Sequence, residues 1–377
     1  MKEGWKYERL GNVCDILDGK RKPITKNKRV PGSIPYYGAS GVLDYVRDYI
    51  FDEKLVLLGE DGAKWGAGEA SSYIIEGKTW VNNHAHALRP KRQIIIDEFL
   101  TYFLNYSNLL DYITGVTVPK LNQEKMRSIP IPLPSLSEQE RIVAFLDAEF
   151  EKIDQLKANA AAQLQAAKDL FQAALKEMLT PNEEWEEKKL GEVVGKLVDG
   201  SHNPPKGIKE SSYRMLSSRN IENNNILVND DVRFLSKDDF DRENKRTIAQ
   251  ENDVVLTIVG TIGRSAVLSK NDLPITFQRS VAIMSPLEML DSRYLMYFFR
   301  SSASLLNTEA QGVAQKGIYL NQLRGLNIKF PPLPEQQRIA ERLDAISEKV
   351  KALQSNYNQT LTLCNDIKQA LLKSIFA

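Results

Sequence analysis

The stretch LPSLSEQERIVAFLD (residues 133–147) decides how this chain is organised, because it returns as PPLPEQQRIAERLD at residues 331–344. Each copy holds prolines, then Glu-Gln, then Arg-Ile, then Leu-Asp. Residues 135–180 and 335–377 contain neither proline nor glycine. Two copies of one signature indicate an internal duplication, which has to be settled before any single motif is interpreted.

The two proline-free segments have the pattern of long α-helices. Ser137 can cap the first while Glu140, three residues on, reaches back, and Pro334 occupies a first-turn position where proline is tolerated. Apolar residues then recur at spacings of three and four, a heptad-like rhythm that predicts a coiled-coil seam. The expected seam residues are Leu146, Phe150, Ile153, Ala160, Leu164, Ala167, Phe171, Ala174 and Met178, then Ile339, Leu343, Ile346, Val350, Leu353, Tyr357, Cys364, Ile367 and Leu371. Each helix should be about 60 Å long.

Further matches precede both copies in the same order. Trp5 with LGNV corresponds to Trp185 with LGEV, and an Asp-Gly pair, a G-x-x-G turn and the segments FLTYFL or YLMYFF follow in each half. We therefore expect four parts. They are a first domain at 1–136, a central helix at 137–180, a second domain at 181–334 and a C-terminal helix at 335–377.

The short connection after the first helix predicts how the parts are arranged. TPNEE (residues 180–184) is all that separates this helix from Trp185, so the second domain should sit at its far end. The second helix can then run back along the first. Short apolar runs such as SIPYYG, LVLLG and DVVLTIVG, joined by glycine-bearing turns, predict strands within each domain. The expected fold is α+β, with two mixed domains containing twisted sheets, separated by an antiparallel coiled coil.

Composition fits an ordinary globular protein with more than one domain. The chain has 377 residues, 42% hydrophobic and 26% charged, with a net charge of +1. Two cysteines, Cys14 and Cys364, suggest neither a disulfide framework nor a zinc site and favour a reducing compartment. No apolar run reaches the ~18 residues of a membrane span, and the N-terminus lacks a signal-peptide pattern. We expect a cytoplasmic protein that does not bind membranes.

Over its full length the chain resembles the specificity subunits of type I restriction-modification systems. The resemblance is carried by the paired P-x-L-x-E-Q-x-R-I with its long helix, by IPYYGASGVLDY and LVLLGEDG in the first half, and by DGSHNPP and NDVVLTIVGTIGRSAV in the second. It implies two target-recognition domains that each read half of a bipartite double-stranded DNA site. It also implies two methyltransferase subunits docked on the helices, joined by restriction and translocase subunits. KRKPITKNKRV has no counterpart beside SHNPPKGIKES, which implies an asymmetric target.

The densest positive charge lies in KRKPITKNKR (residues 20–29), where six of ten residues are basic. Its proline and polar spacing favour an exposed loop over a helix. Two interpretations stay open, a solvated loop and an arm that contacts DNA phosphates. If the arm binds DNA, removing one phosphate interaction should change the log-log salt slope by ~0.9.

The base-reading candidates all lie in the second half and are Arg219, Asn220, Arg264, Gln278 and Arg279. Arginine suits guanine, and asparagine or glutamine suits adenine, through bidentate bonds in the major groove. The alternative for each candidate is a surface ion pair. The full set of expected DNA-binding residues is Lys20, Arg21, Lys22, Lys26, Lys28, Arg29, Lys64, Asn82, Asn83, His84, His202, Lys206, Arg219, Asn220, Thr261, Arg264, Gln278, Arg279 and Lys316.

The segment HAH would place His84 and His86 on one face of an extended strand, shared with Asn82. Metal binding is disfavoured, because no cysteine or acidic cluster accompanies them in the sequence. DNA contact or plain strand surface is the favoured interpretation. The G-x-x-G pairs, Gly59/Gly62 and Gly260/Gly263, should form tight turns, with backbone approach to a phosphate as the alternative.

Catalytic motifs are incomplete. NPPK (residues 203–206) is similar to the Asn-Pro-Pro-aromatic motif of amino-methyltransferases, but Lys206 cannot stack on a base as an aromatic ring does. No glycine-rich cofactor loop follows an early strand, and GEDGAKWG does not fit G-x-x-x-x-G-K-[ST]. We therefore expect no catalysis and no cofactor. The competing hypotheses are a self-sufficient methyltransferase or nuclease, and a coiled-coil scaffold without a nucleic-acid role.

Overall fold

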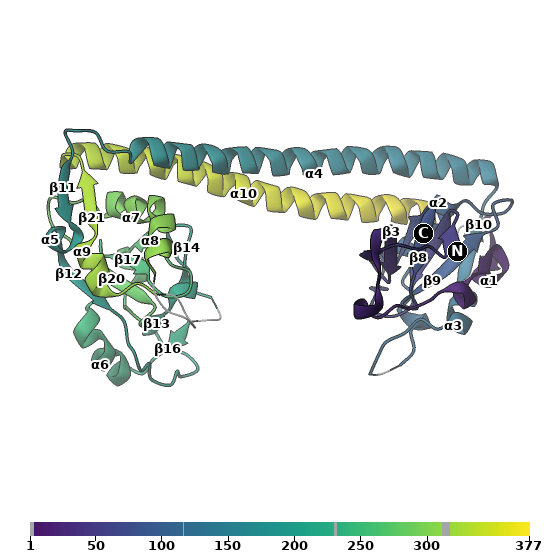
Figure 1. Ribbon diagram of the computed structural model, residues 1–377, viewed down its shortest axis with the longest axis horizontal. Helices are drawn as coiled ribbons and strands as arrows, with labels where there is room; N and C mark the ends of the chain where they lie inside the picture. Colours follow the sequence, from purple (N-terminus) through teal and green to yellow (C-terminus); the bar gives the residue numbers. More distant parts are fainter. Residues whose placement is uncertain (1–3, 116, 230–231, 311–316) are drawn as a thin grey trace. The chain divides into compact units, whose positions relative to one another are not determined.

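The chain divides into two compact units that share two long helices (Figure 1). A computed structural model describes residues 4–115, 117–229, 232–310 and 317–377. Unit 1 consists of Met1–Ala162 and Asn356–Ala377, and unit 2 of Gln163–Ser355. Helices α4 (Leu136–Met178) and α10 (Leu333–Phe376) each contribute one part of their length to either unit. Each unit therefore combines a globular domain with a pair of helical segments.

The described part of unit 1 contains three sheets, ordered β1-β10, β2-β9-β6-β7 and β4-β3-β8-β5. Its strands are β1 (Lys6–Arg9), β2 (Cys14–Ile16), β3 (Pro31–Gly38), β4 (Gly41–Val46), β5 (Phe51–Asp52), β6 (Leu55–Gly59), β7 (Ser72–Ile75), β8 (Lys78–Val81), β9 (Ala85–Pro90) and β10 (Pro130–Leu133). Its domain helices are α1 (Leu10–Val13), α2 (Asp97–Tyr106) and α3 (Gln123–Arg127), with 3-10 turns η1 (Asp18–Lys20), η2 (Lys26–Lys28) and η3 (Leu110–Tyr112).

The described part of unit 2 contains sheets ordered β11-β21, β12-β20-β17-β18, β16-β13-β19 and β14-β15. Its strands are β11 (Glu186–Lys189), β12 (Val194–Asp199), β13 (Arg214–Leu216), β14 (Ile221–Glu222), β15 (Asn225–Ile226), β16 (Arg233–Phe234), β17 (Val254–Thr257), β18 (Ser265–Val267), β19 (Ile275–Phe277), β20 (Val281–Pro286) and β21 (Asn327–Phe330). Its domain helices are α5 (Leu190–Val193), α6 (Lys237–Thr247), α7 (Ser292–Ser301), α8 (Ala303–Glu309) and α9 (Leu320–Gly325), with 3-10 turns η4 (Ser218–Asn220) and η5 (Lys270–Asp272).

The two domains share one sheet topology, which confirms the duplication predicted from the sequence. The order β2-β9-β6-β7 in unit 1 corresponds strand by strand to β12-β20-β17-β18 in unit 2. A second sheet in each unit contains a parallel pair, β3 with β8 and β13 with β19. Central strands β6 and β17 are buried at every residue, as expected for uninterrupted apolar runs that are covered on both faces. Both domains are therefore mixed α+β.

In unit 1 the helical segments pack antiparallel, as predicted. Lys368 Nζ donates to Asp154 Oδ1 at 2.7 Å, and Lys157 Nζ donates to Asn365 Oδ1 at 2.9 Å. Residue numbers rise along α4 while they fall along α10 between these two bonds. Leu146 of α4 and residues 372 and 376 of α10 join the domain core, so the helix pair is continuous with the domain that it carries.

The helical segments of unit 2 are also antiparallel. Residues 177 and 178 line one hollow together with Arg338 and Arg342, whereas Lys168 lines another together with Lys351. Phe171 and Leu343, from α4 and α10, are buried in one core with the domain helix α7. Helix α7 matches α2 of unit 1, and both were predicted from the sequence.

Two details of the helix predictions were wrong. The first long helix is capped by Ser135 rather than Ser137, because the Ser135 carbonyl accepts from the amides of Glu138 and Gln139, both at 3.0 Å. Ile367 is 47% exposed instead of lying in the seam. Lys368, four residues after Cys364, takes the contact position instead. Its ammonium lies 4.9 Å from the centroid of the Phe150 ring of α4.

The G-x-x-G segments form tight turns, as predicted. Gly62, Gly260 and Gly263 have φ values of +67°, +85° and +93°, a backbone region that disfavours residues with a Cβ. Gly59 is required for a different reason. A Cβ at this position would lie 2.2 Å from the Cβ of Ala63.

Candidate nucleic-acid interface

Four of the candidate residues meet at one cleft in unit 2. His202, Arg219, Gln278 and Arg279 line a hollow of about 560 Å³. They come from three separate segments, the loop after β12, the turn η4 after β13, and the turn between β19 and β20. The fold therefore gathers side chains that are up to 77 positions apart (279 − 202) in the sequence.

Parallel pairing of β13 with β19 explains why these segments meet. Because both strands end at the same edge of the sheet, the turns that follow them are neighbours. The Gln278 amide donates to the Leu216 carbonyl at 2.8 Å, and the Arg279 amide donates to the Ser201 carbonyl at 2.9 Å. These backbone bonds hold the three segments together while the side chains of the turn remain at the cleft.

The cleft is cationic and rich in hydrogen-bond donors. Arg219, Arg233 and Arg279 line it together with four serines, and the described lining residues include no carboxylate. His202 Nε2 lies 2.7 Å from Asp199 Oδ2, so this imidazole is oriented by the carboxylate. A concave surface with guanidinium, hydroxyl and amide groups suits phosphates and base edges.

Arg233 was missed by the sequence analysis. It belongs to β16, which pairs with β13 and so delivers Arg233 to the cleft from a fourth segment. Its Nη1 donates to the Pro205 carbonyl at 2.8 Å. No motif surrounds this residue in DDVRFL, and only the strand pairing could have revealed its position.

Asn220 does not support the predicted base contact. Its side chain is fully buried, with Oδ1 accepting from the Ser217 amide at 2.9 Å and Nδ2 donating to Leu227 O and Asn229 Oδ1 at 3.2 and 3.0 Å. Asparagine at this position therefore closes the loop after β13. Its polar groups are already bonded and face the protein interior.

The other candidates of unit 2 lie around the cleft or apart from it. Lys206 is exposed on the loop that contributes His202. Thr261 is exposed on the turn after β17, and Arg264 from the same turn lines a separate hollow of about 250 Å³. Lys316 lies outside the described residues.

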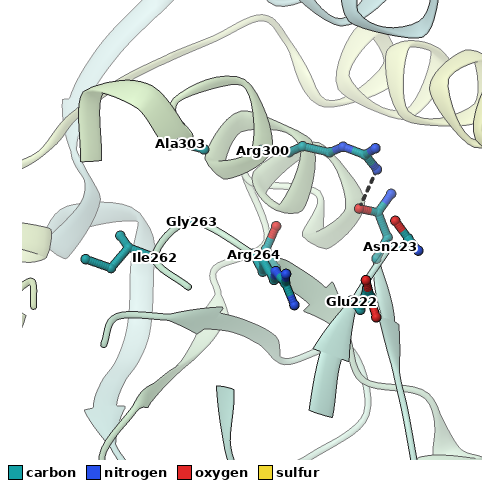
Figure 2. Close-up of a pocket in the computed structure, with 9 residues that line it drawn as sticks. Glu222, Asn223, Ile262, Gly263, Arg264, Arg300 and Ala303 are labelled. Atoms are coloured by element: carbon teal, nitrogen blue, oxygen red, sulfur yellow. Dashed lines mark hydrogen bonds between the residues drawn. The ribbon is translucent and has the colours of Figure 1, made fainter. Parts of the chain in front are cut away.

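Figure 2 shows this second hollow, whose lining residues include Arg264 and Arg300. Arg300 Nη1 donates to Asn224 Oδ1 at 2.8 Å, and its guanidinium lies 4.3 Å from the centroid of the Phe171 ring. Arg300 therefore ties α7 both to the β14–β15 hairpin and to α4. Its contacts explain its position as part of the packing of unit 2.

In unit 1, the basic segment 20–29 separates into exposed lysines and internal arginines. The exposed side chains are those of Lys20, Lys22, Lys26 and Lys28. Arg29 donates to Asp44 Oδ2 at 3.0 Å and lies over the ring of Tyr36. Consistent with the predicted loop, the segment has no α-helix and contains only single 3-10 turns among extended residues.

Arg21 turns inward to a cluster of buried charges. Its Nη1 lies 2.5 Å from Glu60 Oε2, and Lys120 Nζ lies 2.7 Å from Glu60 Oε1. His86 Nδ1 is 2.6 Å from Asp18 Oδ2, while its Nε2 is 2.7 Å from the Leu121 carbonyl. Both ring nitrogens therefore face oxygen atoms, which fixes the orientation of the ring.

This cluster corrects the interpretation of HAH. Asp18 and Glu60 do accompany His86 in space, and the three residues offer ligand atoms within 4.8 Å of one another. Arg21 and Lys120 already neutralise these carboxylates, however, so the arrangement is an ion-pair network rather than a metal centre. His84 and His86 also differ in environment, since His84 is 49% exposed beside Asp61 and His86 is buried.

The remaining candidates of unit 1 have mixed positions. Asn82 is buried, and its Oδ1 accepts from the His84 amide at 2.8 Å, so it shapes the turn instead of facing solvent. Asn83 is exposed in that turn, and Lys64 is exposed with Glu69 4.0 Å away. The Lys22 amide donates to the Val81 carbonyl at 3.3 Å, which brings Lys22 to the end of β8 that precedes Asn83.

Comparison with known proteins assigns the family. Residues 2–166 and 182–363 match the type I restriction modification DNA specificity domain. A putative type I restriction enzyme specificity subunit from Haemophilus influenzae is 28% identical over 351 residues, covering 90% of this chain and 86% of the relative. The MjaVIII specificity subunit of Methanocaldococcus jannaschii is 24% identical over 382 residues, which cover 93% of this chain and 87% of the relative.

Solved structures agree on the fold. One solved structure describes complex assembly and conformational transition of a type I R-M system. A chain of that structure aligns with a TM-score of 0.73 at 19% identity, and the alignment covers 99% of this chain and 97% of the solved chain. The HsdS subunit of Thermoanaerobacter tengcongensis aligns at 0.54 with 20% identity, covering 100% and 97%. Among the described residues, no helix is apolar over enough of its length to span a membrane. From its family match and its duplicated fold, the chain belongs to the non-catalytic DNA specificity subunits of type I restriction-modification systems.

Proposed function

We propose that the two domains read the two halves of one bipartite, asymmetric DNA target. The observation that carries this proposal is the pairing of one repeated fold with two unlike cationic surfaces. Unit 2 has a cleft lined by Arg219, Arg233 and Arg279, whereas unit 1 has an exposed lysine loop at residues 20–28. Two domains of the same fold that present different DNA-binding surfaces suit two different half-sites.

Within unit 2 we assign base reading to the cleft. Arg219 and Arg279 have the planar donor fork that matches guanine, and Gln278 can bond adenine through its amide. The serine hydroxyls of the cleft, and Lys206 on the loop that contributes His202, suit phosphates, which fix the register of the domain on DNA. In unit 1 the lysines supply phosphate contacts beside the Asn83 turn. A phosphate-contacting role is favoured over a merely solvated loop because the backbone bond from Lys22 to Val81 holds Lys22 beside that turn.

The helices provide a surface for protein partners. Leu156, Leu363 and Ile367 are 56%, 60% and 47% exposed on the helix pair of unit 1. Phe145, at 43%, lies 11 residues before Leu156 and therefore on the same side of α4, three turns away. We define Phe145, Leu156, Leu363 and Ile367 as the apolar stripe. Exposed apolar side chains gathered on one helix pair mark protein interaction sites, and we propose that methyltransferase subunits dock there, with restriction and translocase subunits joining that core.

Methylation mapping tests the proposal. The chain would be expressed with the methyltransferase subunit of its own host, in a strain without other adenine methyltransferases, and modified adenines would be located genome-wide. The expected result is one motif with two defined parts, different from each other and separated by a fixed unread gap. A contiguous motif, a palindromic motif or an absence of methylation despite a stable complex would contradict the proposal.

A further inference from the structure

Each long helix begins with a buried glutamine. Gln139 of α4 and Gln336 of α10 have no exposed surface, although glutamine is among the residues most often found in solvent. Both follow the glutamate of the repeated signature, so they occupy equivalent positions in the two halves. A buried amide that has to be fully bonded is costly to place, and its recurrence calls for a specific explanation.

In unit 1 the amide of Gln139 bonds three backbone groups. Its Oε1 accepts from the Ile96 amide at 2.9 Å, and its Nε2 donates to the carbonyls of Ile94 and Pro134, both at 3.0 Å. Ile94 and Ile96 immediately precede helix α2 of the domain. Pro134 lies at the entrance to α4 itself. The side chain therefore joins the domain to the first turn of the long helix.

Gln336 repeats this pattern in unit 2. Its Oε1 accepts from the Asp291 amide at 2.8 Å, and its Nε2 donates to the carbonyls of Met289 and Pro331 at 2.9 and 2.8 Å. Met289 and Asp291 precede α7, the counterpart of α2. All three bonds have the same donor, acceptor and place in the fold as those of Gln139.

A second attachment lies eight residues further along each helix. The Tyr102 hydroxyl of α2 donates to Asp147, and the Tyr297 hydroxyl of α7 donates to Asp344 Oδ1 at 2.6 Å. In both halves the aspartate is the last residue of the repeated Leu-Asp. Eight residues span ~12 Å of helix. One attachment point leaves the domain able to pivot, whereas two points at this separation fix its angle.

We propose that Gln139 and Gln336, together with Asp147 and Asp344, are positioning residues that fix the angle of each recognition domain on its own helix. Core packing by Leu146 or Leu343 supplies stability but is non-directional, whereas hydrogen bonds specify one arrangement. This inference rests on the proposed function. If the domains read two half-sites, their angle on the helices limits the number of base pairs that can separate those half-sites.

The test compares gap lengths. The wild-type chain, Gln139→Met and Gln336→Met would each be assembled with the methyltransferase subunit, and methylation rates would be measured on duplexes with the native gap or with one base pair added or removed. Methionine has nearly the volume of glutamine but cannot form the three bonds. Gln337→Met and Gln165→Met, at exposed positions of the same helices, are the matched controls.

Wild type and controls should strongly prefer the native gap. In the Gln139 and Gln336 variants, the ratio of rates on native and altered gaps should fall at least tenfold. This ratio compares substrates for one protein preparation, so a uniform loss of folded protein does not change it. Should the methionine variants fail to fold, Tyr102→Phe and Tyr297→Phe remove the second attachment with a smaller perturbation and should lower the same ratio.

A ratio equal to that of wild type in folded glutamine and tyrosine variants would overturn the inference and leave the proposed function intact. A wild-type complex without a preferred gap, in contrast, would overturn the proposed function itself. The two failures are therefore distinguishable in one set of measurements.

Discussion

Arg21 Nη1 lies 2.5 Å from Glu60 Oε2 in the interior of unit 1, although Arg21 belongs to the most basic segment of the chain. The side chains of both residues are about one-tenth exposed, at 11% and 10%. Neighbouring lysines of the same segment remain in solvent. One short stretch of sequence thus contains residues that stabilise the domain and residues that are free to meet a ligand.

Replacing Arg21 should destabilise unit 1. Arg21→Met removes one partner of Glu60 and one of Asp18, while Lys120 remains beside Glu60 and the His86 ring remains hydrogen-bonded to Asp18. We expect a decrease of about 3 kcal/mol in the free energy of unfolding, the lower end of the cost of breaking a buried ion pair. Urea denaturation of the variant measures this decrease. Lys22→Met, at an exposed neighbour, is the control, and an equal effect of both changes would contradict the assignment.

The exposed lysines should act through phosphates. Replacing Lys22, Lys26 and Lys28 together by alanine should weaken DNA binding of the assembled complex to a similar degree on target and unrelated sequences. The slope of log affinity against log salt should become shallower by ~0.9 for each phosphate that is no longer neutralised. Fluorescence anisotropy across a salt series measures this slope. An unchanged slope would show that the loop is only solvated.

Acid should destabilise unit 1 through its buried carboxylates. Burial alone would raise the pKa of Asp18 and Glu60, but His86 beside Asp18, and Lys120 and Arg21 beside Glu60, hold the pKa of each carboxyl below its ordinary value. A folded-state pKa below the unfolded one stabilises the protein above about pH 4, and this contribution disappears as pH falls through the folded value. Unfolding free energies at pH 7, 5, 4 and 3 should show the decrease.

The variant Asp18→Asn is the comparison for this pH dependence. It should be less stable than wild type at pH 7, with a difference that shrinks toward pH 3, because protons bind the Asp18 carboxyl of the unfolded wild type first as the pH falls below about 4. A difference that stays constant from pH 7 to pH 3 would contradict an ionised Asp18 in the folded protein.

The cleft of unit 2 should determine base preference. Arg279→Ala and Gln278→Ala should each reduce the preference of the complex for its target over a single-base variant by ~1 to 3 kcal/mol, because alanine cannot form the bidentate bond to one base. Lys237→Ala, a change of surface charge on α6, should leave the preference unaltered. Competition binding against duplexes that differ at one position measures it. Equal weakening on every duplex would reassign these side chains to phosphates.

The apolar stripe should matter for assembly more than for folding. Leu363→Glu and Ile367→Glu change side chains that are about half exposed, so the unfolding free energy should shift by less than ~0.5 kcal/mol. Co-purification with the methyltransferase subunit should fall sharply, because a carboxylate would have to be desolvated in the interface. Ala158→Glu, at an exposed position two residues beyond Leu156 and therefore on a different side of α4, is the control. Full assembly of the leucine and isoleucine variants would exclude this surface.

Periodicity and repetition were sufficient to predict the architecture. The seam from Leu146 to Phe171, the duplicated signature and the helices at α2 and α7 depend on spacing within a segment, which a single sequence displays directly. Helix α6 was missed because its residues KDDFDRENKRT are almost entirely charged. Its helical form depends on a cap by Ser236, which accepts from the Asp239 amide, and on the burial of Phe240.

The site was predicted in part, since composition shows which side chains can bind DNA but not which of them face solvent. Parallel pairing of β13 with β19 brings Arg219, Gln278 and Arg279 together at the cleft, and no local sequence pattern predicts this pairing. Arg21 and Asn220 have the right chemistry, yet their hydrogen bonds are used inside the protein. Burial of a polar residue depends on partners distant in sequence, and that information is absent from a single chain read alone.

Phe376 packs against Trp5, Phe99 and Phe103 in the core of unit 1, at centroid distances of 6.4, 5.5 and 5.5 Å. During synthesis, the ribosome has to translate the whole of unit 2 between the two parts of this core. At 5 to 20 residues per second, that interval lasts on the order of 10 to 40 s. Over this time the nascent N-terminal domain lacks the ring of Phe376, so the domain that is synthesised first completes its core only after unit 2 has been translated.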